Sequence, residues 1–259
     1  MEKLGAKKQS TCFFLDSSIL IPEILVQKDE RTSKLKKDAI FHNVPCYFSN
    51  SVKLETERKV TDTINFIGDT IRNNLITKLG DSRKLRRIPF FAPLTNDDIK
   101  DLENFFYDIQ GAARAEHTLT DPVSLVEEWI ICFLAEKIDK GVTITIMELG
   151  TELIKTILKL TVAIRDSSDY LLLYEKGFAK KKNLPPDARF GLVKTNLETE
   201  GIHPPDSEHL AFAVLNQILN AEKTIFVTFD YKTILNNRTI VSNNHGLECS
   251  DPLYAAHHL

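Results

Sequence analysis

The sequence has little of what marks several classes of protein. Its 259 residues carry a net charge of only −3, so the chain lacks an overall basic character, and any phosphate-binding surface must be local. No apolar run reaches the roughly 18 residues that a membrane-spanning helix needs. Asp16 interrupts the one N-terminal apolar stretch that resembles a signal peptide. Since 42% of the residues are hydrophobic, we expect a globular protein with a substantial core.

Cysteine is scarce and scattered. None of the four cysteines belongs to a C-x-x-C pair, which argues against both a zinc site and a disulfide framework. Reduced thiols are the simpler interpretation, and they are typical of a cytoplasmic protein. The four residues are Cys12, Cys46, Cys132 and Cys249.

One helix-then-strand unit near the C-terminus carries two carboxylates. Pro205 suits the start of a helix, and apolar residues follow Asp206 at four-residue steps, which puts Asp206 in the first turn. The short apolar run from Ile225 to Val227 is typical of a strand buried on both faces of a parallel sheet. Asp230 follows that strand. Ligand sites of open α/β sheets lie beyond the carboxyl ends of their strands, so further acids are expected there.

The N-terminal part supplies such acids. Thr11–Leu15 is predicted to be a strand, and Asp16 follows it directly. A second strand is predicted within Val44–Phe48, followed by a long helix whose first turns contain Glu55 and Glu57. Helix side chains lean toward the N-terminus, so either glutamate can reach back toward the strand end.

If the strands are parallel, these acids meet at one edge of the sheet. Hard oxygen ligands of this kind suit Mg²⁺ or Mn²⁺, which bind a few carboxylates together with phosphate oxygens of a substrate. Such an ion generates a nucleophilic hydroxide and stabilises phosphoryl transfer. The sequence therefore predicts a metal-dependent phosphodiesterase. Its candidate catalytic residues are Asp16, Glu55, Asp206 and Asp230, with Asp16, Asp206 and Asp230 as metal ligands.

Three segments carry these acids in a recognisable order. Leu15–Leu20 has an Asp followed by two small polar residues, Asp206–Ala211 reads D-x-x-H-L-A, and Val227–Asp230 ends in T-x-D. Together they resemble the signature segments of the PIN domain family of nucleases. The resemblance implies a three-layer α/β/α Rossmann-like fold with a central parallel sheet, and an endoribonuclease that cleaves RNA with Mg²⁺ or Mn²⁺. It also implies that Ser18 and Thr228 support the site through their hydroxyl groups.

The match to the family is not complete. Glu55 has the family's spacing from Ser49, the polar residue after the second strand, but Thr56 follows where the family has an aliphatic residue. Glu57 therefore remains an alternative helix acid. The further acid that some members carry shortly after the last Asp is missing, since Lys232 occupies that neighbourhood.

The resemblance covers the two ends of the chain and leaves a helical middle. We expect an N-terminal part of the PIN-like domain in residues 1–80, a helical insertion in 81–200 and a C-terminal part in 201–259. The insertion could clamp substrate, mediate homo-oligomerisation or bind a partner such as an inhibitor protein. Weaker patterns suggest strands at Val142–Ile146, Thr239–Val241 and Leu247–Cys249.

Two basic clusters interrupt this region. One lies within Arg83–Arg87, and the other includes Lys180, Lys181 and Lys182. We predict that these three lysines contact phosphates of a nucleic acid, with RNA favoured. A solvated surface is an equally simple interpretation of each cluster.

Three other interpretations fit part of the pattern. An inactive PIN-like scaffold or RNA-binding module would keep the fold without using its acids. A haloacid-dehalogenase-type phosphatase would need a second Asp at the position of Ser18. If the acids served only as helix caps, that role would explain Asp206 well, and Asp16 with Asp230 poorly.

Overall fold

The computed structural model describes residues 10–25, 29–71, 93–94, 96–115, 121–185 and 187–259. The chain divides into two compact units, Met1–Glu57 with Ser167–Leu259, and Arg58–Asp166. The second unit is thus inserted into the first. The sequence placed the boundaries at residues 80 and 200, whereas the compact units meet at residues 57 and 58 and at residues 166 and 167. The cluster at Arg83–Arg87 lies outside the described residues.

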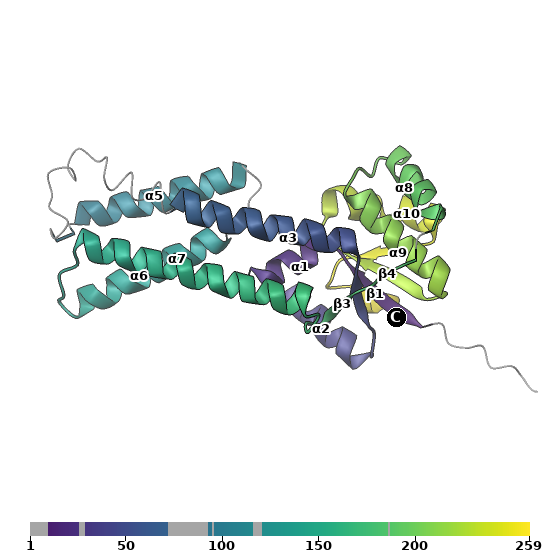
Figure 1. Ribbon diagram of the computed structural model, residues 1–259, viewed down its shortest axis with the longest axis horizontal. Helices are drawn as coiled ribbons and strands as arrows, with labels where there is room; N and C mark the ends of the chain where they lie inside the picture. Colours follow the sequence, from purple (N-terminus) through teal and green to yellow (C-terminus); the bar gives the residue numbers. More distant parts are fainter. Residues whose placement is uncertain (1–9, 26–28, 72–92, 95, 116–120, 186) are drawn as a thin grey trace, which may run out of the picture. The chain divides into compact units, whose positions relative to one another are not determined.

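The first unit is built on a five-stranded, all-parallel sheet with the order β3-β2-β1-β4-β5 (Figure 1). The central strand β1 is apolar along its length, and its last four residues are completely buried, as a strand covered on both faces requires. The strands are β1 (Thr11–Leu15), β2 (Cys46–Phe48), β3 (Ala179–Lys181), β4 (Lys223–Val227) and β5 (Glu248–Ser250).

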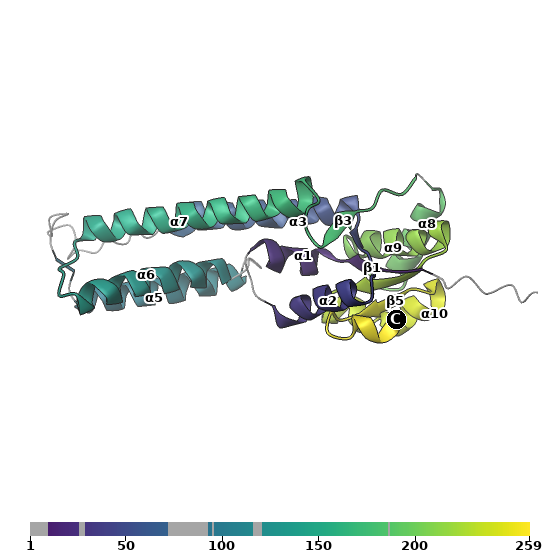
Figure 2. The ribbon, with the colours of Figure 1, turned by 90° about the horizontal axis from the view of Figure 1, so that it is seen from below.

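Helices cover both faces of this sheet, so the predicted three-layer, Rossmann-like α/β architecture is confirmed. Three helices after β3 pack on one face around a buried cluster that includes Phe14, Leu210 and Phe226. The connection from β1 to β2 lies on the other face (Figure 2). The helices are α1 (Ser17–Ile24), α2 (Glu30–Phe41), α8 (Arg189–Thr199), α9 (Asp206–Asn220) and α10 (Arg238–His245), with short turns η4 (Tyr231–Leu235) and η5 (Ala255–His258).

The described part of the second unit is helical. It contains the C-terminal part of α3 (Asn50–Asn65), then η1 (Phe66–Ile71), α5 (Asn96–Ala115), α6 (Asp121–Asp139) and most of α7 (Ile146–Ser168). An apolar stripe along α7, which includes Leu149, Leu153 and Leu160, is buried. None of the described helices combines the length and apolar character needed to span a membrane.

Two predicted strands are wrong and one strand was missed. Thr239–Val241 lies in helix α10, where Val241 alone is buried, and the run Val142–Ile146 contributes only an isolated bridge from Thr145 to Pro93. Strand β3 was missed because it reads as a basic cluster. A three-residue strand carries too little apolar periodicity to be recognised.

Candidate metal centre

The site lies at the carboxyl edge of the sheet. Leu15 pairs with Val227 at the ends of β1 and β4, and the backbone N–H of Asp16 donates a 3.0 Å hydrogen bond to the carbonyl oxygen of Val227. Asp16 and Asp230 therefore follow neighbouring parallel strands at the same edge, as predicted from the sequence. Asp16 is only 3% exposed, which makes its hydrogen-bond partners decisive for its charge.

The carboxylate of Asp16 is held by three side chains. Ser18 Oγ donates to Oδ2 at 2.7 Å, Thr228 Oγ1 donates to Oδ2 at 2.8 Å, and His209 Nδ1 lies 3.0 Å from Oδ1. Burial alone would raise the pKa of Asp16. The hydrogen bond and charge of His209, with the bonds from Ser18 and Thr228, hold that pKa below its usual range. Asp16 is therefore ionised and fixed, and it makes no capping hydrogen bond to α1.

His209 links Asp16 to the glutamate on α3. It lies three residues after Asp206 on α9, and it is completely buried. Its Nε2 atom is 3.5 Å from Oε2 of Glu55. The sequence contained His209 in the D-x-x-H-L-A segment, but no role was predicted for it. The signal was its spacing from Asp206, because residues three apart share one face of a helix.

The two facing atoms of this pair are buried and unsatisfied. Neither His209 Nε2 nor Glu55 Oε2 has a hydrogen-bond partner among the residues that the structure describes. If Nδ1 carries the proton that is donated to Asp16, Nε2 presents a lone pair to a carboxylate oxygen. Two such groups repel each other unless a proton or a metal ion lies between them.

A positive charge is also favoured on His209 itself. Burial lowers the pKa of His209, but the hydrogen bond to Asp16 and the negative charges of Asp16, Glu55 and Asp206 outweigh burial and raise it. The site thus attracts positive charge, whether as a second proton on the imidazole or as a metal ion.

Asp206 occupies the first turn of α9 and has a strongly altered acidity. Burial, followed by the negative charges of Asp16 and Asp230, raises its pKa to about 7, while His209 acts in the opposite direction. Its carboxylate accepts no hydrogen bond from the described residues, and so it is not the helix cap that its position suggested. Asp206 therefore shares its proton equilibrium with the other acids of the site.

Asp230 is the acid that caps a helix. Its Oδ1 atom accepts a 2.9 Å hydrogen bond from the backbone N–H of Thr233 at the start of η4, and its own N–H donates to Thr228 Oγ1 at 2.9 Å. The expectation that capping explains Asp230 poorly is wrong. The capping bond leaves Oδ2 available, and the charge of Asp230 acts on Asp206.

The structure separates the two candidate glutamates. Helix α3 begins after Ser49, whose Oγ accepts a 3.1 Å hydrogen bond from the N–H of Val52. Glu55 turns toward His209 with 17% of its side chain exposed. Glu57 is 43% exposed and lies 3.5 Å from Nζ of Lys53. Glu55 is thus the glutamate that faces the other acids.

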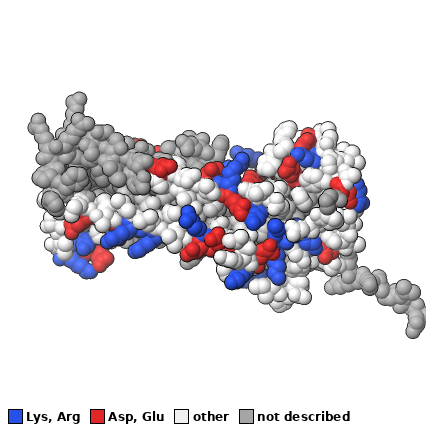
Figure 3. Space-filling view, in the orientation of Figure 1, with Lys and Arg blue, Asp and Glu red and all other residues white. Residues whose placement is uncertain are grey.

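The predicted lysines lie on and just after the edge strand β3. Lys182 Nζ is 3.4 Å from Oε2 of Glu222 and 4.2 Å from the ring centroid of Tyr47, so its charge already has partners. Lys180 is exposed, and Lys181 is half-buried. On the face seen in Figure 3, basic residues are interspersed with acidic ones. Phosphate contacts from this segment therefore remain a prediction for Lys180 and Lys181.

The side chains fit a metal ion. Ligand atoms of Asp16, Glu55 and His209 all lie within 4.8 Å of one another. Glu55 and His209 also contribute the two unsatisfied buried atoms described above. A histidine that ligates a metal commonly donates its other ring N–H to a carboxylate, as His209 Nδ1 does to Asp16. Of the predicted metal ligands, Asp16 belongs to this group, whereas Asp206 and Asp230 are linked to it through their charges.

This assignment rests on geometry. No protein-family model, no curated protein and no solved structure matches the chain.

Proposed function

We propose that the protein is a metal-dependent nuclease that hydrolyses phosphodiester bonds, with RNA as the favoured substrate, and that its first unit is a PIN-like domain. One observation carries the proposal. His209 Nε2 and Glu55 Oε2 are buried and unsatisfied 3.5 Å apart, beside the ionised Asp16. A divalent cation satisfies both atoms. The preference for RNA rests on the resemblance to the PIN family.

The protein's own residues prepare this centre for hydrolysis. Ser18 and Thr228 fix Asp16, and His209 orients it from the other side. Asp206, with a pKa of about 7, can accept or release a proton at neutral pH, as general acid-base chemistry requires. When bound, Mg²⁺ or Mn²⁺ would supply an activated water and stabilise negative charge on the phosphate.

A second function is favoured by the raised pKa of His209. A doubly protonated imidazole would donate to both Asp16 and Glu55 and would neutralise them without any metal. The first unit would then be an inactive scaffold or a nucleic-acid-binding module. The two functions differ in whether a divalent cation can compete with the second proton on His209.

Metal-dependent cleavage decides between these functions. Mixed-sequence RNA and DNA would be incubated with the protein in Mn²⁺, in Mg²⁺ and in EDTA. The expected result is cleavage of RNA with metal, none in EDTA, and none by Glu55→Gln, whose amide no longer provides an anionic ligand. Absence of cleavage, together with no calorimetric heat of Mn²⁺ binding, would establish the scaffold instead.

A further inference from the structure

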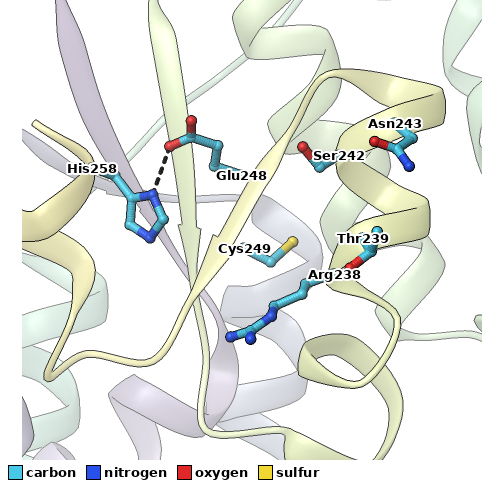
Figure 4. Close-up of a pocket in the computed structure, with 7 residues that line it drawn as sticks. All are labelled: Arg238, Thr239, Ser242, Asn243, Glu248, Cys249 and His258. Atoms are coloured by element: carbon cyan, nitrogen blue, oxygen red, sulfur yellow. Dashed lines mark ion pairs between the residues drawn. The ribbon is translucent and has the colours of Figure 1, made fainter.

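Two open hollows run along the free edge of strand β5, between α10 and η5. Their volumes are about 280 and about 220 Å³, and they adjoin because Arg238, Cys249 and His258 line both. Among the strands that the structure describes, β5 is the last of the sheet, so one of its edges has no described neighbour. We call these two hollows together the edge groove. Figure 4 shows the larger hollow, with Arg238 projecting from α10 beside Cys249.

The side chains that line the edge groove include one arginine, Arg238, and two carboxylates, Glu248 and Asp251. Glu248 Oε2 lies 3.0 Å from Nδ1 of His258 and 3.4 Å from Nζ of Lys223, so one cation, Lys223, already faces this carboxylate. Arg238 is exposed and has no ion-pair partner among the residues that the structure describes.

The second carboxylate of the groove is also engaged. Asp251 accepts a hydrogen bond from the hydroxyl of Tyr231 and lies 3.5 Å from a guanidinium nitrogen of Arg31. Arg31 also pairs with Asp29 at 3.0 Å, so its charge is shared between Asp29 and Asp251. Arg238 is the arginine of the groove that can still bind an anion. A planar guanidinium with free N–H groups is suited to phosphate oxygens.

Polar donors surround this arginine. Thr239, Ser242 and Asn243 are exposed along α10 and line the larger hollow, where hydroxyl and amide groups can donate to phosphate or sugar oxygens. Two tyrosines line the smaller hollow, and their rings are accessible, since Tyr231 is 51% exposed and Tyr254 is 52% exposed. Exposed aromatic rings beside an arginine are typical of surfaces on which single-stranded bases stack.

The smaller hollow lies at the same carboxyl edge of the sheet as the candidate metal centre, since Ser250 at the end of β5 and the following Asp251 line it. Tyr231, which lines the smaller hollow, directly follows Asp230 in the chain. A single-stranded nucleic acid that has one phosphodiester bond beside Asp16 and Asp230 can therefore continue into the groove. We propose that the edge groove binds the backbone of a single-stranded nucleic acid, with a phosphate on Arg238 and bases against Tyr231 and Tyr254. The path of the nucleic acid from the groove to the metal centre rests on the proposed nuclease function, whereas binding in the groove does not.

Binding in the absence of metal tests the groove separately from cleavage. The affinity of the protein for a short fluorescent single-stranded RNA would be measured in EDTA over a series of salt concentrations. Arg238→Gln is expected to weaken binding about fivefold. It should also reduce the slope of log affinity against log salt concentration by the equivalent of about one phosphate contact. Ser242→Trp, which fills the larger hollow without changing charge, should weaken binding as well.

The matched control is Lys232→Gln. Lys232 is an exposed cation on η4 that does not line either hollow, and its loss changes the net charge by the same amount. The affinity of the Lys232→Gln variant for the RNA should change less than about twofold. Equal losses for both variants, or no loss for Arg238→Gln, would overturn the proposal, because the attraction would then be non-specific. Failure of the wild type to bind RNA would overturn it too.

Two competitors identify the ligand class. Inorganic phosphate at millimolar concentration should displace the RNA only weakly, because it occupies one contact of many. Full displacement by phosphate would make the groove a site for a small anion, and displacement by an acidic peptide would make it a protein-binding site. Either result overturns the proposal. RNA binding through Arg238 without any cleavage in Mn²⁺ would refute only the nuclease function.

Discussion

His209 Nδ1 lies 3.0 Å from Oδ1 of Asp16, although 193 positions separate the two residues in the chain. This contact orients the imidazole so that its second nitrogen faces Glu55. The histidine therefore holds Asp16 through Nδ1 and, in the proposed metal centre, presents Nε2 to the ion. Substitutions that keep one nitrogen position and remove the other can distinguish them.

His209→Asn should weaken metal binding about 10- to 100-fold. The asparagine amide can still donate to Asp16 from the position of Nδ1, but no atom remains beside Glu55. Calorimetric titration with Mn²⁺ measures the change. His245→Asn is the control, since His245 also lies 3.0 Å from a carboxylate, that of Glu200, away from the centre. An unchanged Mn²⁺ affinity for His209→Asn would show that Nε2 does not face the ion.

Asp206 should make the metal-free protein less stable as pH rises. Its pKa is about 7 in the folded protein against 3.8 for an unperturbed aspartate, so the folded state binds this proton more tightly than the unfolded chain. The resulting stabilisation is present at pH 4 and is lost as pH rises through 7. Asp206→Asn should therefore raise the Tm at pH 8 by a few degrees, since about 1 kcal/mol corresponds to roughly 2–4 °C in a protein of this size.

Thermal denaturation in EDTA at pH 5 and at pH 8 measures this effect. The difference between Asp206→Asn and the wild type should shrink at the lower pH. Asp62→Asn, which alters an exposed acid on α3, should leave the Tm within about 1 °C of the wild type at both values. A destabilised Asp206→Asn at pH 8 would mean that its ionised carboxylate is favourable in the folded state.

Asp230 combines a capping bond with an unfavourable charge, and two substitutions separate them. Asp230→Asn keeps an oxygen for the N–H of Thr233 and removes a charge that acts on Asp206, so it should raise the metal-free Tm and abolish cleavage. Asp230→Ala also loses the cap, which costs about 1 kcal/mol. Its Tm should lie below that of Asp230→Asn, and the opposite order would contradict the capping role.

The two glutamates of α3 should differ sharply in activity. Glu55→Gln is expected to abolish metal-dependent cleavage because Glu55 faces His209, whereas Glu57→Gln should reduce the rate only mildly because Glu57 is paired with Lys53. Initial rates on RNA at saturating Mn²⁺ provide the comparison. A larger loss for Glu57→Gln would place the helix acid one half-turn further along α3.

The lysines on and just after β3 should differ in whether they contribute to stability or to RNA binding. Lys182→Gln should lower the Tm with little change in RNA affinity, because it loses Glu222 and the ring of Tyr47. A double substitution of Lys180 and Lys181 by Gln should instead weaken RNA binding and flatten its salt dependence. Filter binding over a range of salt concentrations measures both quantities. If the double variant binds RNA as the wild type does, Lys180 and Lys181 form only a solvated surface.

The sequence predicted the parts of the fold that carry strong apolar periodicity. Strand β1 was predicted with its observed limits, and α9 begins at Asp206 as expected. Strand β3 was missed because an alanine followed by two lysines carries little periodic signal, and α10 was misread because it contains one turn of β-branched residues. Burial by neighbouring elements decides the structure of such short segments.

The acids of the site were predictable because each adjoins a strand end or a helix start. His209 was not, since its importance depends on which carboxylates surround its ring, and these come from β1 and α3. The altered acidity of Asp206 likewise results from charges brought together from distant parts of the chain. Local patterns place single residues on elements, but they do not contain distances between elements.

The pairing of the first strand with the fourth has a consequence for protein synthesis. Asp16 obtains its hydrogen bond from Thr228 only when 212 further residues have been made, and β1 has no partner in β4 before that point. Translation adds roughly 5–20 residues per second, so the edge of the sheet that carries Asp16 stays unassembled until β4 and Thr228 have been made. Under the proposed function, the nascent chain therefore has no complete site with which to cleave RNA before that point.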